Sequence, residues 1–506
     1  MTNVRDAERA GPLALDDTDG IEELRAALDR AGYRIERIED VLQVERLSSR
    51  PADLALQLRR LPATGPFATL VRLLLLGTTA ARVDAEAAFA PMPIERLIAL
   101  GVLEERPDNE IRGSIKLVPH GGVLIASDHE RDGQPVPEDV VAGVHPPSVV
   151  LAKLAVWLPV ERALDVGTGN GIQALFAAQH CEHVIATDIS QRALDFAAFN
   201  ARLNGVDNIE FRRGSFFEPV EGERFDLVLC NPPYLISPDS LYTYRDSGMG
   251  GDSVSSELVS RAPEYLVEGG FAHLLVSWIR REHDGWSDRL REWTAGSGCD
   301  AFFLHYQTER PIDHAESWLA PLAAGPIAEY ERALDRWLDY FSQEAIASIS
   351  HGAVMLRRRK AARNWVRAEE LPTNRLLPAS VHMLRIVAAE DFLEGLARPE
   401  DLLDERLALV DAHQLDQRLA AREGGLAHLH TSLSLDEGLG FVIGVDLETA
   451  ELLPALDGSA TVRDALAARA RERELNEDRL ARAAHPVIRR LFELGFLERQ
   501  SSSTSR

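Results

Sequence analysis

The stretch Ala163-Leu164-Asp165-Val166-Gly167-Thr168-Gly169-Asn170-Gly171 is a short apolar run that breaks into three alternate glycines. An apolar pattern of helical spacing follows it through Ile172, Leu175 and Phe176. This order predicts a strand, a tight turn and a helix. Glycines suit such a turn because they adopt unusual backbone angles and let a ligand approach the main chain. The stretch therefore predicts a ligand-binding turn.

A second predicted strand carries an acidic residue at its tip. The run Val184-Ile185-Ala186-Thr187 ends in Asp188, whose carboxylate can accept both hydroxyls of a ribose. A dinucleotide site would require G-x-G-x-x-G, with a pyrophosphate at the helix N-terminus. This chain instead has G-x-G-x-G preceded by Asp165, and an acid there would repel a pyrophosphate. The pattern favours a cationic nucleoside such as S-adenosylmethionine.

The motif Asn231-Pro232-Pro233-Tyr234 follows a third predicted strand, at 225–230. Two consecutive prolines stiffen the turn and fix the direction of the Pro232 carbonyl and of the Asn231 side chain. These two acceptors can hold both hydrogens of a planar –NH2 group and turn its lone pair toward an electrophilic methyl group, while Tyr234 stacks on the group. A strand-ending turn without chemistry is the alternative. The glycine turn and Asp188 upstream favour the functional interpretation.

These motifs identify a resemblance that covers about residues 145–358. The region resembles class I S-adenosylmethionine-dependent methyltransferases with the Asn-Pro-Pro-Tyr signature, which is shared by adenine-N6, cytosine-N4 and glutamine-N5 enzymes. Leu235-Ile236-Ser237-Pro238 after the tyrosine, and Gly250-Gly251-Asp252-Ser253 further on, are most similar to HemK-type protein-glutamine methyltransferases of the eukaryotic and archaeal branch.

The resemblance also implies roles for individual residues. The glycine turn would cradle the methionine part of the cofactor, and the tip of the second strand its ribose. Ser215 stands where the family usually carries an aspartate that contacts adenine. The implied cofactor-binding residues are Asp165, Gly167, Thr168, Gly169, Asn170, Gly171, Asp188, Ile189, Ser215, Phe216 and Asn231, and the implied catalytic residues are Asn231, Pro232, Pro233 and Tyr234. No metal ligand is predicted.

Composition limits the class of protein. A chain of 506 residues suggests about three domains, and 45% hydrophobic residues with 27% charged residues are typical of a soluble globular protein. A net charge of −25 argues against general affinity for polyanions. The three cysteines are widely spaced, so they predict neither a disulfide framework nor a zinc site, and a reducing cytoplasm fits. The apolar run 70–76 is too short to span a bilayer.

Alternating strand and helix patterns predict the fold class α/β, with a Rossmann-like, seven-stranded methyltransferase sheet. Helical, winged-helix-like domains are expected on either side of it. The predicted domains are 1–140, 141–368 and 369–506. The predicted strands are 161–166, 184–188, 208–213, 225–230 and 271–277, and the helices are 171–179, 190–204, 256–267 and 284–294. A final hairpin of 299–307 and 352–358 is interrupted by a helical insertion at 308–350, and the N-terminal domain ends in strands 111–118 and 122–127.

Three further features of the sequence have an interpretation, and two of them have competing interpretations. The polar segment 235–255 is either a lid or a surface loop. Asn200 and Asn204 are expected to cap their helix locally. The basic run 357–360 with Arg363 is the strongest nucleic-acid signal, but a solvated strand end is the preferred interpretation.

Together these observations predict a cytoplasmic N-methyltransferase that uses S-adenosylmethionine and acts on a planar amide or amine nitrogen. A glutamine side chain in a protein is the favoured acceptor. Adenine-N6 methylation of RNA or DNA is the alternative, and a non-catalytic binding module is a third hypothesis. The sequence does not address the oligomeric state.

Overall fold

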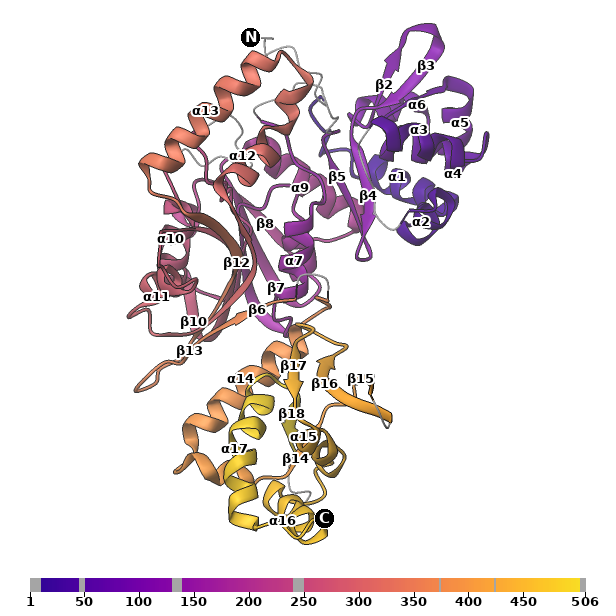
Figure 1. The fold of residues 1–506 in the computed structure, drawn as a ribbon. Helices are drawn as coiled ribbons and strands as arrows, with labels where there is room; N and C mark the ends of the chain where they lie inside the picture. The colour runs from indigo at the N-terminus through magenta and orange to yellow at the C-terminus, as the bar shows by residue number, and fades with distance from the viewer. Residues whose placement is uncertain are drawn as a thin grey trace. The chain divides into compact units, whose positions relative to one another are not determined.

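The computed structural model describes residues 11–44, 51–129, 139–239, 250–372, 375–422 and 425–500. The chain forms two compact units (Figure 1). The first contains residues 1–151 and 158–368, and the second contains residues 152–157 and 369–506. The three-domain division at 140 and 368 remains a prediction, but the first two predicted domains share one unit.

The N-terminal part of the first unit is helical and ends in small sheets. Its first helix begins after Asp17, whose side chain accepts a hydrogen bond from the Gly20 amide, and ends at Gly32 in the left-handed conformation. A three-stranded sheet of order β1-β3-β2 follows the helices. The elements are α1 (Thr18–Ala31), α2 (Ile35–Leu42), α3 (Pro51–Arg60), α4 (Pro66–Leu70), the π-helix η2 (Val71–Leu75), β1 (Thr79–Ala81), α5 (Arg82–Phe89), α6 (Ile94–Ala99), β2 (Leu103–Arg106) and β3 (Glu110–Gly113).

The predicted strand 111–118 is wrong, because two strands in two sheets occupy it. After β3 the Ser114 amide donates to the Val102 carbonyl, and β4 (Lys116–His120) then pairs with β5 (Val123–Ser127). Buried residues alternate in β3, and β4 continues the apolar run with three consecutive buried residues, so the sequence shows no break at the change of partner. Periodicity reports which face is buried, not which strand supplies the hydrogen bonds.

Two asparagine side chains close the outer edge of β5. Asn200 accepts a hydrogen bond from the Ala126 amide at 2.8 Å and donates to the Ala126 carbonyl at 3.0 Å. Asn204 makes the same two contacts with Leu124, both at 2.8 Å. Four residues of helix rise about 6 Å and two residues of strand about 6.8 Å, so the two amides match alternate residues of β5. The predicted local role is therefore wrong for Asn200, whereas Asn204 also donates to the Asn200 carbonyl of its own helix at 2.8 Å.

The helix that carries these asparagines, α9 (Gln191–Asn204), belongs to two cores at once. Phe196, Phe199 and Leu203 pack into the same apolar core as helices α1 and α4. Ala201 packs with residues of α8 and β5. The N-terminal helices therefore share an apolar core with a helix of the catalytic sheet and are not connected to it by the chain alone.

The catalytic sheet has eight strands in the order β13-β11-β12-β10-β9-β6-β7-β8. Strands β8, β7, β6, β9 and β10 run parallel, and β12 pairs antiparallel with β10 on one side and with β11 on the other. The strands are β6 (Val160–Val166), β7 (Cys181–Asp188), β8 (Ile209–Arg213), β9 (Phe225–Cys230), β10 (Leu266–Arg280), β11 (Cys299–Glu309), β12 (Ser348–Arg358) and β13 (Val366–Glu370), and the helices beside them are α7 (Pro146–Leu154), α8 (Ile172–Ala177), α9, α10 (Ser253–Arg261) and α11 (Asp288–Thr294).

The α/β class and the predicted strand positions are confirmed, but the count of seven strands is wrong. Residues Val366–Glu370, for which the sequence analysis predicted no strand, form the edge strand β13. The Ala301 amide of β11 donates to the Trp365 carbonyl, which starts this pairing. The predicted helix 256–267 is also too long: a 3-10 turn at Ala262–Tyr265 follows α10, and β10 begins at Leu266.

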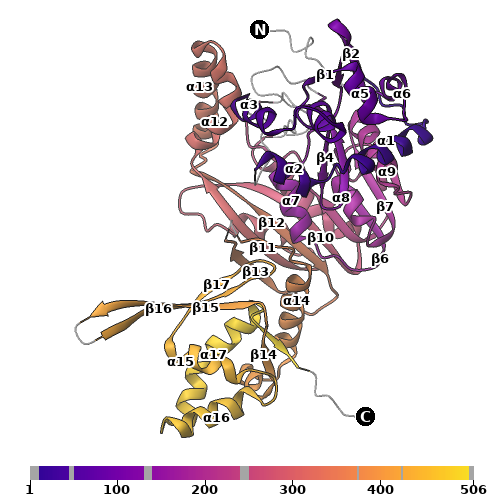
Figure 2. The same ribbon diagram turned by 90° about the vertical axis from the view of Figure 1, so that its right-hand side faces the viewer.

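The predicted hairpin and its helical insertion are present. Strands β11 and β12 pair over their full lengths, and the chain between them forms α12 (Pro311–Leu319) and α13 (Ile327–Gln343), joined by a 3-10 turn. Figure 2 shows both helices at one end of the long strands. Their apolar faces pack on Leu235 and Ile236, directly after the Asn-Pro-Pro-Tyr motif. The insertion therefore lies beside the predicted site.

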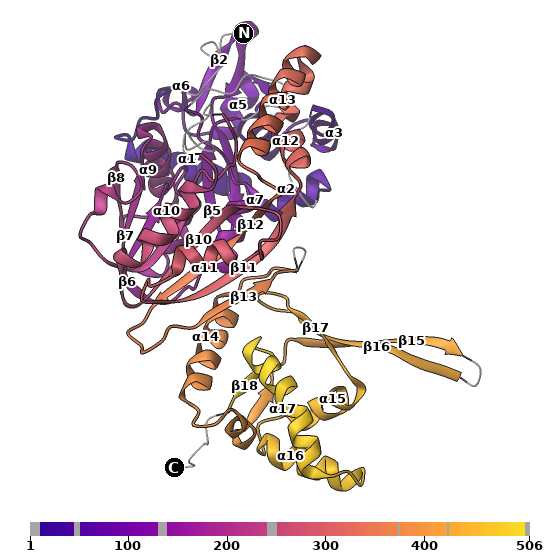
Figure 3. The same cartoon turned by 60° about the vertical axis from the view of Figure 1, so that its left-hand side comes forward.

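The second unit combines helices with short sheets, and its β15–β16 hairpin is prominent in Figure 3. Its helix α16 begins after Thr461, which forms a reciprocal capping box with Asp464. No described helix is long and apolar enough to cross a membrane. The elements are α14 (Ser380–Gly395), β14 (Leu407–Leu409), β15 (His413–Arg422), β16 (Gly425–Leu435), β17 (Val442–Val445), α15 (Leu447–Leu452), α16 (Val462–Glu472), α17 (Glu477–Glu493) and β18 (Leu497–Arg499).

Candidate active site

Strand β6 is the point at which the strand order of the sheet reverses. It pairs with β7 on one side and with β9 on the other. Its last residue, Val166, lies opposite Cys230, the last residue of β9. Gly167 and Asn231 therefore start at the same level on neighbouring strands. Open α/β sheets bind ligands at this position, outside the carboxyl ends of the strands.

The three glycines after β6 have different functions. All three adopt left-handed backbone angles, with φ of 70° at Gly167, 55° at Gly169 and 84° at Gly171. A Cβ atom on Gly171 would lie 2.9 Å from the Ala197 Cβ, so this glycine lets α8 approach α9. A Cβ atom on Gly167 or Gly169 would meet no atom within 4 Å. The backbone of the turn thus faces open space that a ligand can fill.

Asp165 is buried beneath this turn. Its Oδ2 atom accepts hydrogen bonds from the Thr168 hydroxyl at 2.6 Å and from the Ala174 amide at 3.0 Å. Burial raises the pKa of the Asp165 carboxyl to about 7, although both hydrogen bonds oppose the shift. Asp165 therefore fixes the turn to the first turn of α8, in addition to its predicted contact with the cofactor.

Asp188 connects the second strand to the same turn. Its Oδ2 atom accepts from the Gly169 amide at 2.9 Å, and its Oδ1 atom accepts from the Ser190 amide at 2.8 Å. Burial raises the pKa of the Asp188 carboxyl, and these amides oppose the shift. The neighbouring Ile189 side chain is 55% exposed. The tip of β7 thus presents a carboxylate beside an exposed apolar side chain.

The predicted adenine-contact residues lie at the next strand end. The Ser215 amide donates to the Glu218 carboxylate at 3.2 Å. Phe216 has a φ of 47°, which is unfavourable for a residue with a side chain, and its carbonyl accepts from the Thr187 hydroxyl. This contact holds the segment against the tip of β7, next to Asp188.

Ser148 and Gln173, to which the sequence analysis assigned no role, support the Asn-Pro-Pro-Tyr motif. Asn231 Nδ2 lies 3.4 Å from the Ser148 hydroxyl, and the Ser148 carbonyl accepts from Gln173 Nε2 at 2.7 Å. Ser148 thus connects the motif with α8. Asn170 Nδ2 donates to the Ala142 carbonyl at 2.8 Å, which fixes the segment before α7 over the turn. Two prolines, at 146 and 147, make this segment visible in the sequence, but they give no sign of the contacts that Ser148 makes.

Tyr234 has a second tyrosine as a neighbour, because its phenol interacts with the phenol of Tyr306 on β11. Burial raises the pKa of both phenols, so both are neutral donors and acceptors at neutral pH. Tyr306 had no signal in the sequence, because it lies 72 residues after Tyr234 in the chain and comes close to it only in the folded sheet.

The insertion helix α13 fixes the chain on both sides of residues 240–249, which lie outside the described structure. Asp239 accepts hydrogen bonds from Arg336 Nη2 and Trp337 Nε1, both at 2.7 Å. The Gly251 amide donates to the Tyr340 hydroxyl at 2.8 Å. Of the segment 235–255 that was predicted to be a lid or a surface loop, residues 240–249 lie outside the described structure, and their flanks are anchored.

With this geometry established, comparisons with known proteins address the family. Residues 147–284 match the family described as "Methyltransferase small domain". Residues 30–113 and 385–499 match two families described as domains of unknown function (DUF7059 and DUF7782). The release factor glutamine methyltransferase of Xylella fastidiosa (strain 9a5c) is 40% identical over 140 residues, which are 25% of this chain and 47% of that protein.

The "Putative protein N5-glutamine methyltransferase" of Methanocaldococcus jannaschii is 32% identical over 144 residues, which are 27% of this chain and 72% of the relative. The chain belongs to the HemK-type methyltransferase family. It spans about half the length of the first bacterial relatives that it matches. A solved methyltransferase from Pyrococcus furiosus is 17% identical, with a TM-score of 0.27, over 43% of this chain and 88% of that one.

Within this HemK-type domain, the basic run is part of the structure. Arg357 and Arg359 both donate to Asp300, which is fully buried, at distances from 2.6 to 3.0 Å. The Arg358 guanidinium donates to the Pro263 carbonyl. The interpretation of the run as a solvated strand end is therefore wrong for Arg357, which is 8% exposed. These contacts also weaken the run as a nucleic-acid signal.

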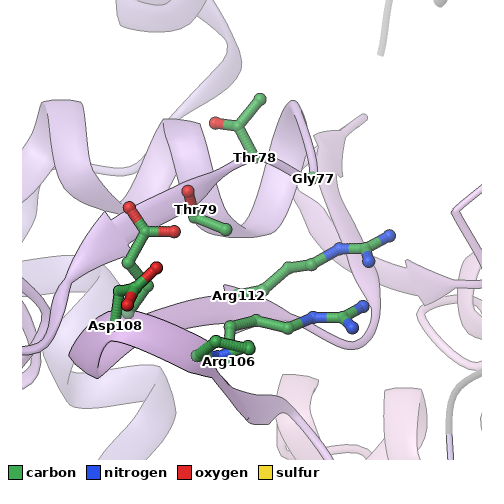
Figure 4. Close-up of a pocket in the computed structure, with 8 residues that line it drawn as sticks. Gly77, Thr78, Thr79, Arg106, Asp108 and Arg112 are labelled. Atoms are coloured by element: carbon green, nitrogen blue, oxygen red, sulfur yellow. The ribbon is translucent and has the colours of Figure 1, made fainter.

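A surface hollow of about 410 Å³ lies in the N-terminal part, away from the HemK-type motifs. Figure 4 shows Arg106 and Arg112 side by side in its wall, opposite Thr78 and Thr79. Both arginines are paired with Glu104, at 2.9 and 3.7 Å. The hollow is therefore separate from the predicted site residues, which lie where β6, β7 and β9 end.

Proposed function

We propose that the chain transfers a methyl group from S-adenosylmethionine to the side-chain amide nitrogen of a glutamine in a protein. The observation that carries the proposal is the pairing of Val166 with Cys230. It places the glycine turn and the Asn-Pro-Pro-Tyr motif side by side at the switch point of the sheet. Membership of the HemK-type family supports the same reaction.

The proposed cofactor site consists of backbone and two carboxylates. The open backbone at Gly167 and Gly169 accommodates the methionine part, with Asp165 beneath it. Asp188 accepts the ribose hydroxyls, and Ile189 with Ser215 and Phe216 borders the base. When bound, S-adenosylmethionine supplies a methyl group on a sulfonium sulfur, which is an electrophile.

The proposed acceptor site holds a neutral amide. Asn231 Oδ1 and the Pro232 carbonyl accept the two N–H bonds of the glutamine side chain, and Pro233 keeps the turn rigid. Tyr234, oriented by Tyr306, stacks on the amide plane. Drawing both hydrogens into hydrogen bonds localises the nitrogen lone pair. Because the nitrogen releases its proton after attack, no strong base is required, and alignment supplies much of the acceleration.

A protein substrate is favoured over a nucleic acid for two reasons. The relatives are named for release factors and for the ribosomal protein uL3, which are proteins. The basic run that could contact phosphates is instead bonded to Asp300 and Pro263. The net charge of −25 also disfavours approach of a polyanion.

The test is methyl transfer from labelled S-adenosylmethionine by the full chain. Purified release factors and ribosomal protein uL3 from the same organism serve as first acceptors, and a lysate serves as the wider pool. Mass spectrometry should locate one added methyl group on a glutamine. Asn231→Ala should abolish transfer while binding the cofactor normally, because its contact is made with the acceptor. Label that stays with RNA or DNA after proteolysis would establish adenine methylation instead.

A further inference from the structure

Three metal-ligand side chains meet where the insertion joins the sheet. Glu309 is the last residue of β11, His314 lies in α12 and His351 lies in β12. Their side chains are 21%, 1% and 14% exposed, respectively. The cysteine spacing that the sequence analysis used to search for zinc could not find a site built from histidine and glutamate.

The ligand atoms of the three side chains converge. Glu309 Oε2 lies 2.8 Å from His314 Nδ1 and 3.6 Å from His351 Nε2, and one ligand atom from each residue lies within 4.8 Å of the others. The separation from His351 is too long for a hydrogen bond. Among the described residues, His351 Nε2 is buried and has no hydrogen-bond partner. A buried nitrogen that faces a carboxylate in this way requires an explanation.

The outward-facing atoms of all three residues are already held. His314 Nε2 lies 3.2 Å from the Ile236 carbonyl, and His351 Nδ1 lies 2.7 Å from the Ser277 hydroxyl. Gln307 donates to Glu309 Oε1. Metal-binding histidines characteristically donate their second ring nitrogen to such a partner, which fixes the ring and leaves the other nitrogen for the ion. Each of the three side chains thus has one polar atom in contact with a neighbouring residue and a second polar atom directed toward the centre of the cluster.

Aromatic side chains pack beside the cluster. The ring centroid of His314 lies 6.1 Å from those of both Trp337 and Phe341, and the His314 and His351 rings stack at 5.9 Å. Apolar neighbours lower the local dielectric constant, which strengthens the attraction between an ion and its ligands.

We propose that Glu309, His314 and His351 bind a divalent zinc ion. Two imidazole nitrogens and one carboxylate are a common ligand set for zinc, and a fourth position remains for water or a substrate atom. Zinc–ligand bonds of about 2.0–2.2 Å place ligand atoms about 3.4 Å apart. The 3.6 Å separation of His351 and Glu309 already fits, and His314 would have to move away from Glu309 by about 0.6 Å.

The position of this site gives the ion a role in the molecule. The site joins α12 to β11 and β12, the two strands between which the insertion lies. Through His314 it also reaches the Ile236 carbonyl, two residues after Tyr234. A bound ion would therefore fix the segment that follows the Asn-Pro-Pro-Tyr motif. This inference does not depend on which molecule accepts the methyl group.

The experiment is a zinc titration of the full chain after chelator treatment, monitored by isothermal calorimetry. The protein is then gel-filtered and its metal content is measured. We expect one zinc ion per chain. His314→Ala and His351→Ala should each weaken binding at least tenfold. His183→Ala is the matched control, because His183 also faces a single glutamate, Glu210, at 3.4 Å but is exposed to solvent.

Two further measurements distinguish the loss of zinc ligands from misfolding of the variants. His351→Gln keeps a hydrogen-bonding side chain beside Ser277, and circular dichroism should show that it folds while zinc binding is still weakened. Cobalt added to the wild-type chain should give the visible absorption bands of a tetrahedral site. Failure of the wild-type chain to bind stoichiometric zinc would overturn the proposal. So would binding that persists in folded His314→Ala and His351→Gln, or zinc that calcium or magnesium displaces equally well.

Discussion

Replacing Asn200 by alanine should destabilise the chain at a site that can be located residue by residue. Asn200 is completely buried and makes three hydrogen bonds: one from the Ala126 amide, one to the Ala126 carbonyl and one to the Asn170 carbonyl at 2.8 Å. Asn200→Ala leaves these three backbone groups without that partner. Each buried group left unsatisfied costs about 1–3 kcal/mol, and some of them will recover water, so we expect a loss of about 3–4 kcal/mol.

Asn204→Ala is the matched control, one helical turn away. Asn204 bonds to Leu124 and to the Asn200 carbonyl but is only partly buried, so its loss should cost about 1–2 kcal/mol. Because Asn170 belongs to the glycine turn, only Asn200→Ala should also weaken cofactor binding, by about fivefold.

Hydrogen exchange of two amides gives the decisive assay. In Asn200→Ala the Ala126 amide should lose protection while the Leu124 amide keeps more of it, and in Asn204→Ala the order should reverse. Urea unfolding supplies the overall loss. An Ala126 amide that stays protected in Asn200→Ala would refute the idea that asparagine side chains replace a strand at this edge.

Three other expectations follow from the site and its surroundings. Asp188→Ala should weaken S-adenosylmethionine binding by about 1–3 kcal/mol in calorimetry, because the ribose acceptor is lost; unchanged affinity would remove Asp188 from the site. The pKa of Asp165 rises from 3.8 to about 7 on folding, so the unfolded chain releases this proton first and the free energy of unfolding should fall by up to about 4 kcal/mol as the pH rises from about 4 to 7. Comparing urea unfolding of wild type and Asp165→Asn across that range checks the sign, and a constant difference would contradict it. Arg357→Ala should lower the free energy of unfolding by about 3 kcal/mol because it removes one partner of buried Asp300, and thermal unfolding at high and low salt should show the same loss.

The glycine turn, Asp188 and the Asn-Pro-Pro-Tyr motif could be found in the sequence because each is a local pattern with a local geometry. The strands that carry them are short apolar runs, which periodicity detects well. Tyr306, Ser148 and His351 could not be found this way. Each acts through a contact between segments that are distant in the chain, and each is unremarkable among its neighbours in sequence.

Other errors have the same physical origin. The edge strand β13 has an ordinary polar sequence, and its pairing depends on the Arg359–Trp365 segment being held by Asp300. Asn200 and Asn204 were assigned to capping because asparagine usually serves local backbone groups. Their spacing of one helical turn carried the correct information, but only once β5 was known to lie beside them.

The shared core of α9 has a consequence for dividing this protein into parts. The curated relatives match only about 140 residues, which invites excision of a catalytic fragment that starts near residue 141. In such a fragment Phe196, Phe199 and Leu203 would lose the N-terminal helices that cover them. A contiguous aromatic and aliphatic surface of this kind promotes self-association. The insolubility of the fragment would then reflect an uncovered helix, not a defect in the catalytic fold.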